Sequence, residues 1–144
     1  MVDLKISDLG PRISPNIDDD ILQPALGNGT LKPGEPALID PATDKVGAAI
    51  GRFAGIIQEV VTQSIDLAIP DGDPLSLIQP VDGQEYRILI TDPTATYNRD
   101  HPVKIDTTTG KFVIATNLAD SVVAKLKSQI VSGTLATTII WGTT

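Results

Sequence analysis

Apolar positions along this chain come in short runs that are separated by turn residues. Runs rich in Val, Ile, Leu and Thr occupy positions 36–40, 85–91, 102–106, 111–115 and 135–141. Short runs with β-branched residues, bounded by Gly, Pro, Asn or Asp, are typical of β-strands. The pattern predicts a mainly β protein, a small β-barrel-like domain, in which many short strands are joined by tight turns.

Two of these strands belong to an internal repeat. The motif PALIDPATDK at 36–45 returns 66 positions later as PVKIDTTTGK at 102–111, and six of the fourteen positions in the window 36–49 match their counterparts. In each copy an aspartate, Asp40 or Asp106, follows the strand, where its side chain can accept bonds from the amides of the turn. We predict two related strand–turn units, at 36–49 and 102–115, with Asp40 and Asp106 as structural turn carboxylates.

One segment of the chain has helical spacing. Asn117 is a good N-cap with Asp120 at the third helical position, and Gly133 is a terminator; the apolar stripe between them is Leu118, Val122, Val123, Leu126 and Ile130. The pattern predicts one α-helix over about 117–131 that covers the β-structure.

The stretch 46–63 fits two structures. Its apolar residues recur at helical spacing, and Gly47, Gly51 and Gly55 form a stripe on such a helix. Three glycines cost a helix about 1 kcal/mol each relative to alanine, and the β-branched pairs at 56–57 and 60–61 suit a sheet better. We favour strands here, with a helix as the alternative. Turn signals at 70–74 and 80–83 then predict a meander that includes the strand at 85–91.

The first thirty residues are expected to form an extended N-terminal arm, followed by a single β-rich domain over 31–144. Glycine, proline and a run of three aspartates at 18–20 interrupt any periodicity there. The apolar residues Ile17, Ile21 and Leu22 suit contact with another surface, so we assign them to a contact with a partner or another subunit. The alternative is a frayed terminus.

Composition narrows the classes of function. The length of 144 residues suits one core. The net charge of −7 repels phosphate backbones, which argues against nucleic-acid binding. Without cysteine the chain has no disulfide or thiolate metal site. No run approaches the roughly 20 apolar residues of a membrane span or resembles a signal peptide, so we expect no membrane association and synthesis in the cytoplasm.

Candidate catalytic and metal-binding residues are sparse. His101 is the sole histidine, and neighbouring Asp100 is poorly placed to orient it as a base. The aspartates at 18–20 and the Asp71-Gly-Asp73 turn lack the spacing of a calcium loop. No phosphate-binding loop or nucleophile motif is completed. We therefore predict no enzyme activity, no catalytic residues, no metal and no cofactor.

The chain resembles the head decoration (cement) proteins of tailed bacteriophages, of the lambda-like β-tulip type. The resemblance rests on LKPGEPALID at 31–40, KVGAAIG at 45–51 and a helix that runs into a β-branched last strand at 134–141, and it covers about two thirds of the chain. It implies a β-tulip domain that binds the outer surface of an expanded head as a homotrimer and stabilises it against internal DNA pressure.

In this interpretation the partners are the major capsid protein and further copies of the chain. The N-terminal arm would lie on the shell, with Ile17, Ile21 and Leu22 as capsid or subunit contacts. The protein would be located on the outer capsid surface of the virion. Two other classes stay open. A tail, fibre or cell-surface β-domain that binds a receptor or glycan would need Tyr86, Tyr97 or Trp141 as an exposed platform. A small trimeric β-enzyme would act on nucleotides.

Overall fold

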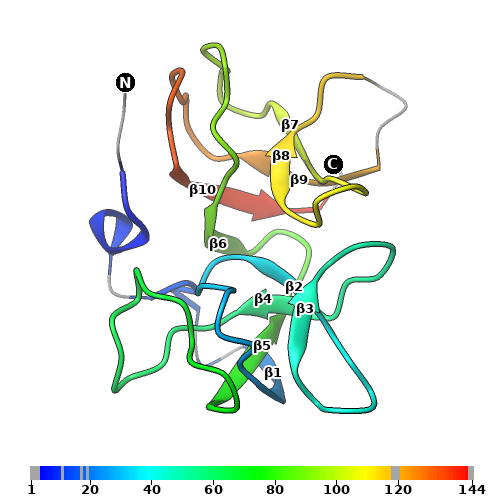
Figure 1. The fold of residues 1–144 in the computed structure, drawn as a ribbon. Coiled ribbons are helices and arrows are strands. Elements are labelled where there is room, and N and C mark those ends of the chain that lie inside the picture. Colours follow the sequence, from blue (N-terminus) through cyan, green and yellow to red (C-terminus); the bar gives the residue numbers. More distant parts are fainter. Residues whose placement is uncertain (1–3, 11, 17, 19, 118–120, 143–144) are drawn as a thin grey trace.

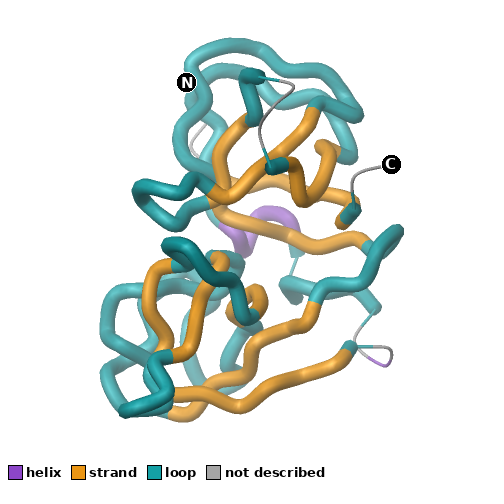
Figure 2. Tube along the Cα trace, turned by 90° about the vertical axis from the view of Figure 1, so that its right-hand side faces the viewer, coloured by secondary structure: helices purple, strands orange, loops and turns teal. Residues whose placement is uncertain are grey.

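The computed structural model describes residues 4–10, 12–16, 18, 20–117 and 121–142. It is mainly β, with ten short strands and one turn of 3-10 helix, η1, at Ile6–Leu9. The strands form two antiparallel five-stranded sheets, one from each half of the chain. The two halves are stacked one above the other (Figures 1 and 2). The prediction of a mainly β protein is confirmed.

The two sheets have the same topology. The first contains β1 (Ile21–Leu26), β2 (Pro36–Ile39), β3 (Val46–Ala48), β4 (Gly55–Ile57) and β5 (Pro74–Gln79). The second contains β6 (Glu85–Leu89), β7 (Pro102–Ile105), β8 (Phe112–Ile114), β9 (Val122–Leu126) and β10 (Ala136–Trp141). Their orders are β1-β5-β4-β2-β3 and β6-β10-β9-β7-β8, so strand for strand the second half repeats the first.

The register is repeated as well. Ala37 pairs with Ala48 in the β2–β3 hairpin, and Val103 pairs with Ile114 in the β7–β8 hairpin, each 66 positions later. In each half a parallel bridge also joins the end of the first strand to the third, at Leu26 with Lys45 and at Ile90 with Phe112. Each sheet therefore curls toward a small barrel. The repeated motif is one part of a larger repeat that spans both halves.

Two apolar clusters form the core. The smaller one lies inside the first half and includes the β5 residues Leu75 and Leu77. The larger one fills the second half and extends to the opposite face of the first sheet, where Ile56 and Ile78 are fully buried. Because side chains alternate along a strand, β5 contributes to both clusters. The halves are therefore joined by a continuous apolar core.

The N-terminal segment 4–16 packs against both halves. Ile6 and Ile13 are 1% and 0% exposed and belong to the larger cluster. The backbone N–H of Ile13 donates to Glu59 Oε2 at 2.9 Å in the first half, and Ile13 O accepts from Arg87 N at 2.7 Å in the second. The described residues of segment 4–16 are thus anchored on the chain's own sheets, and residues 21–26 of the predicted arm form β1.

The predicted α-helix over 117–131 is wrong. Val122–Leu126 is β9, which pairs with both β7 and β10. The apolar stripe also fits a period of two, because Ala124 and Leu126 are fully buried on one face of the strand. The β-branched pair Val122 and Val123 favours that choice, and pairing on both sides outweighs local helix propensity. Leu118 and Asp120 lie outside the described residues.

Most of the other strand predictions are confirmed, but residues 60–61, which were also favoured as a strand, lie in the loop between β4 and β5. The stretch 46–63 contains β3 and β4, as the β-branched residues predict, and β2, β6, β7, β8 and β10 fall in the predicted runs. Gly55 has a packing reason within β4, because a Cβ there would lie 2.6 Å from the backbone oxygen of Ile78. Gly133, predicted to end a helix, instead has a φ of 89° in the turn that precedes β10.

Candidate interaction surface

The two turn carboxylates hold their hairpins in the same way. Asp40 Oδ1 accepts from Ala42 N at 2.9 Å, and Asp106 Oδ1 accepts from Thr108 N at 3.1 Å. The Thr109 hydroxyl also donates to Asp106 Oδ2 at 3.0 Å. These bonds, first from the Thr108 amide and then from the Thr109 hydroxyl, lower the pKa of Asp106 below its ordinary value. Their geometry indicates a structural role for both aspartates.

The predicted contact residues Ile21 and Leu22 begin β1. Ile21 pairs with Gln79 and is 62% exposed, while Leu22 pairs with Ile78 and is 44% exposed. Leu22 lies on the same face of the sheet as its pairing partner Ile78, which is buried in the larger core cluster. Val81, two residues after Gln79, is also exposed. Ile17 lies outside the described residues, so the structure places two of the three predicted contact residues on one strand.

The free edge of β1 offers little for strand addition. Leu26 N donates to Asp44 O, away from β5, so by alternation the amides of residues 22 and 24 also point away from β5. Residue 24 is proline, which has no N–H to donate. The amide of Leu22 is therefore the one donor that this part of the edge directs outward. Side-chain contact through Ile21 and Leu22 suits this edge better than extension of the sheet.

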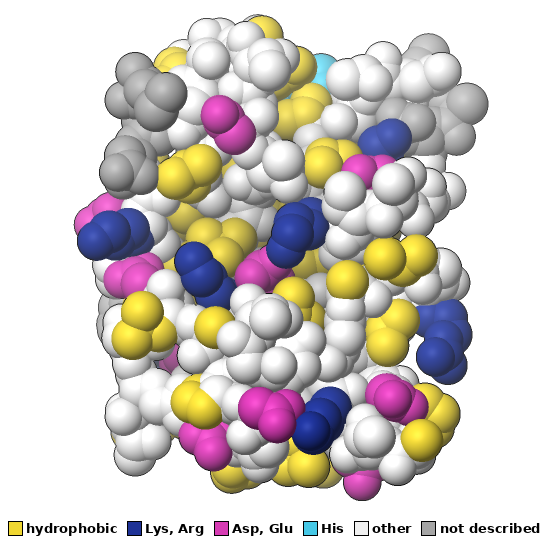
Figure 3. Space-filling view, viewed as in Figure 1, with side chains coloured by type: hydrophobic (Ala, Val, Ile, Leu, Met, Phe, Trp, Pro, Cys, Tyr) yellow, Lys and Arg dark blue, Asp and Glu magenta, His cyan; other side chains and the backbone are white. Residues whose placement is uncertain are grey.

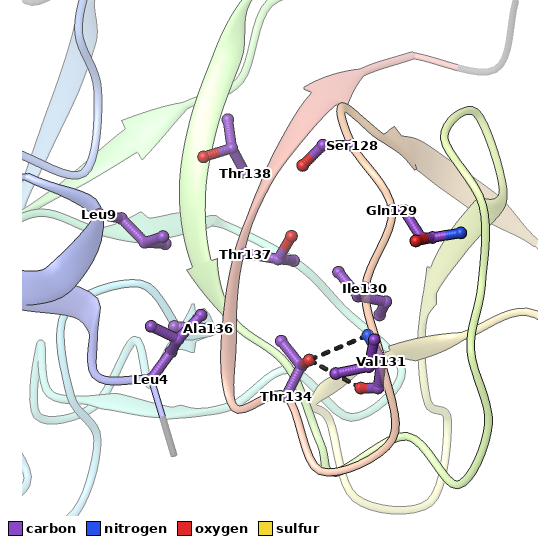
Figure 4. Close-up of a pocket in the computed structure, with 10 residues that line it drawn as sticks. All are labelled: Leu4, Leu9, Ser128, Gln129, Ile130, Val131, Thr134, Ala136, Thr137 and Thr138. Carbon is purple, nitrogen blue, oxygen red and sulfur yellow. Dashed lines mark hydrogen bonds between the residues drawn. The ribbon is translucent and has the colours of Figure 1, made fainter. Parts of the chain in front are cut away.

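A pocket of about 270 Å³ lies between the N-terminal segment and the second half. Figure 4 shows its lining, which comes from Leu4 and Leu9, from β10 and from the loop that precedes β10. Thr134 Oγ1 closes that loop, with bonds of 3.3 Å from Val131 N and 2.7 Å to Val131 O. The lining residues are apolar or neutral and polar. Such a lining offers neither a general acid nor a general base.

A second hollow, of about 380 Å³, lies at the junction of the halves and contains an ion pair. Lys111 Nζ lies 2.6 Å from Glu35 Oε2, and the Glu35 side chain is only 10% exposed. Leu89, Phe112 and Leu135 supply its apolar wall. Figure 3 shows apolar side chains in this central region, with acidic and basic side chains interspersed around it. The ion pair has a structural use, since it ties the two halves together.

His101 has a structural environment. Its Nε2 lies 3.0 Å from Ala115 O, and its ring lies against Tyr97 with centroids 4.8 Å apart. Asp100 is directed elsewhere, with Oδ1 at 3.6 Å from Lys125 Nζ. In the described part of the chain, no three His, Asp or Glu side chains lie close enough together to hold a metal ion.

The aromatic residues pack within the fold. Trp141 stacks on Phe53 with centroids 5.4 Å apart and meets Tyr86 and Phe112 edge to face. Tyr86 and Phe112 are buried, and burial raises the pKa of Tyr86. The three residues proposed as a glycan platform are thus buried or partly buried, with Trp141 and Tyr86 in a cluster that includes Phe53 of the first half.

Sequence reasoning did not single out the two most exposed apolar residues outside β1. Val61 is 98% exposed and Leu67 is 62% exposed, both in the loop between β4 and β5. A β-branched run at 60–62 suggested a strand there, so exposure was not expected from the sequence.

Among the described residues, no helix has the length and apolar character that a membrane span requires. No protein-family model matches the chain, and no curated protein matches it.

Proposed function

We propose that this protein is a capsid decoration protein, which binds the outer surface of an expanded bacteriophage head and stabilises it. The proposal includes a homotrimer, the major capsid protein as partner and the β-tulip class for the fold. It includes no catalytic role and no cofactor. Its primary support is the sequence resemblance at 31–51, together with the exposed apolar pair that the fold presents at the start of β1.

The observation that carries the proposal is the exposure of Ile21 and Leu22 on a strand that is otherwise anchored. β1 is paired along its length with β5, which holds the two side chains in fixed positions. When a partner covers exposed apolar groups on an ordered strand, the free energy of the system falls, because apolar surface is removed from water. The pocket beside β10 is lined by apolar and neutral polar side chains, and the contacts of His101 are structural. Both features are consistent with a binding role.

The test is binding of purified protein to expanded heads from which the decoration protein has been removed. The variant Ile21→Ser/Leu22→Ser is expected to bind about tenfold or more weakly, since burying one such side chain contributes about 1.5–3 kcal/mol. Because both side chains are exposed, its unfolding free energy should stay within about 0.5 kcal/mol per site of the parent value.

The matched control is Val61→Ser, which removes an even more exposed apolar side chain from the loop between β4 and β5. It is expected to bind heads like the parent protein. Equal binding by the parent and by the Ile21→Ser/Leu22→Ser variant would overturn the assignment of these residues. Failure of the parent protein to bind heads would overturn the proposed function itself.

A further inference from the structure

The contact between the two halves joins two different surfaces. The first half contributes an acceptor surface that contains Glu35, the strand end at Ala48 and Ala49, and buried Ile56. The second half contributes a donor surface, the hairpin turn at Gly110 and Lys111. A Cβ on Gly110 would lie 2.6 Å from Ala49 N, and Lys111 Nζ lies 2.6 Å from Glu35 Oε2.

Because the halves share one topology, each surface has a counterpart in the other half. The hairpin offset of 66 makes Asp44 the counterpart of Gly110 and His101 the counterpart of Glu35. Pro36 pairs with Ile56 and Pro102 pairs with Lys125, so Lys125 is the counterpart of Ile56. Because the contact joins unlike surfaces, the donor surface of the first half and the acceptor surface of the second half are not used within the chain. Two unused surfaces of this kind in general allow separate chains to join head to tail.

The unused acceptor surface in the second half is closed by its own side chains. Glu35 reaches across to Lys111, whereas His101 turns back onto its own half, with Nε2 at 3.0 Å from Ala115 O. Ala115 is itself the counterpart of Ala49 at the same offset. Where the first half has fully buried Ile56, the second has Lys125, which is paired with Asp100.

The unused donor surface in the first half is closed by Asp44. Asp44 has a φ of 61° and Gly110 a φ of 70°, so the two turns have the same left-handed conformation at this position. Gly110 is buried against the first half, whereas Asp44 is exposed. In an equivalent contact the Asp44 side chain would meet the backbone at Ala115 of another copy, the counterpart of the Ala49 backbone that leaves no room for a Cβ at Gly110.

We infer that Asp44, His101 and Lys125 prevent copies of this chain from joining head to tail through the surfaces that hold its own halves together. Two kinds of closure act together: a steric block on the donor surface, and a polar replacement of the acceptor surface. Self-association of the chain must then use other surfaces, such as the exposed residues of β1.

The test opens one surface in each of two variants. Asp44→Gly opens the donor, and His101→Glu/Lys125→Ile restores the acceptor, with the introduced glutamate placed to pair with Lys45 of the other chain. Each variant alone still lacks one open surface, so each is expected to sediment like the parent protein. An equimolar mixture is expected to give a faster species that contains both variants.

Two results would overturn the inference. One is a mixture that sediments as its separate components while circular dichroism shows both variants folded. The other is the same fast species from His101→Glu/Lys125→Ile alone, which would indicate nonspecific association through the new isoleucine. If that variant does not fold, His101→Glu/Lys125→Met replaces it, because it also removes both closing side chains of the acceptor, and absence of a mixed species then counts equally against the inference. The experiment involves no capsid, so its outcome is independent of the proposed function.

Discussion

At the scale of single residues, the repeat allows matched comparisons between positions with the same backbone and different surroundings. Asp44 and Gly110 share a left-handed turn, and Lys45 and Lys111 follow them. In each pair, the residue of the second half faces the other half of the chain, while the residue of the first half faces outward. The difference in unfolding free energy between matched substitutions at the two positions of a pair therefore measures what the contact between the halves contributes to stability.

The first prediction concerns Gly110. Gly110→Ala is expected to lower the unfolding free energy by about 2–4 kcal/mol, because left-handed strain and overpacking against the Ala49 backbone add. Asp44→Ala, in the exposed turn, should cost less than about 1 kcal/mol. Urea unfolding measures both. Equal losses would show that Gly110 is not in close contact with the first half.

The second prediction concerns the pKa of Asp106. Its folded pKa lies below the ordinary value of 3.8, so its ionised form stabilises the fold above that pH, and this stabilisation is lost as the pH falls through the folded pKa. Thr109→Val removes a hydroxyl bond and should move the pKa of Asp106 up toward 3.8 in an NMR titration. The control variant Thr43→Val, in the other hairpin, should leave the pKa of Asp106 unchanged. An unaltered pKa in Thr109→Val would refute the hydroxyl's part in lowering it.

At the scale of elements, the N-terminal segment differs most from the expectation of an arm. Ile13 is fully buried, whereas Ile21 is 62% exposed on β1. Ser7 N donates to Asp66 Oδ1 at 3.1 Å, and the bonds from Ser7 lower the pKa of Asp66. The segment therefore contributes to the core as well as to the proposed interaction surface, and its complete removal would not separate the two roles.

The third prediction separates them by substitution. Ile13→Ala should lower the unfolding free energy by about 2–4 kcal/mol, because it creates a cavity in the larger core cluster. Ile21→Ala should change it by less than about 0.5 kcal/mol. Thermal and urea unfolding of both variants provide the measurement. A similar loss in the two variants would mean that Ile21 is covered in the free protein.

The sequence predicts the strands and hairpins well because their signals are local. Turn residues bound each run, and Asp40 and Asp106 occupy the bonded positions that the repeat predicts. β9 could not be distinguished from a helix, because Val122 and Leu126 are four positions apart, which fits both periods, and only pairing with β7 and β10 decides between them. Leu75 and Leu77 in β5 were likewise not assigned to a strand from the sequence.

The candidate site was predictable only in part. The apolar character of Ile21 and Leu22 marks them in the sequence, but their position on a paired strand depends on contact with residues 78–79. The burial of Ile6 and Ile13 depends on both halves and has no local signal. The larger repeat was visible only in its hairpins, because the remaining paired strands share topology rather than residues.

At the scale of the whole molecule, the junction between the halves is expected to contribute measurably to stability. Lys111→Met leaves Glu35 without its cation in a mostly buried place, and should cost about 1–3 kcal/mol. Lys45 forms the corresponding pair with Asp71 at 3.0 Å, where both side chains are exposed. Lys45→Met should therefore cost less than about 1 kcal/mol, as measured by urea unfolding. Equal costs would contradict the structural role of the Glu35–Lys111 pair.

The protein has two linked β-units, an apolar cluster that spans both of them, and two exposed apolar residues, Ile21 and Leu22, on one strand. The most direct measurement of its proposed role is its copy number relative to the major capsid protein in purified particles from its source. A ratio near one is the result that a shell-covering decoration protein predicts. A few copies per particle, or none, would contradict the account.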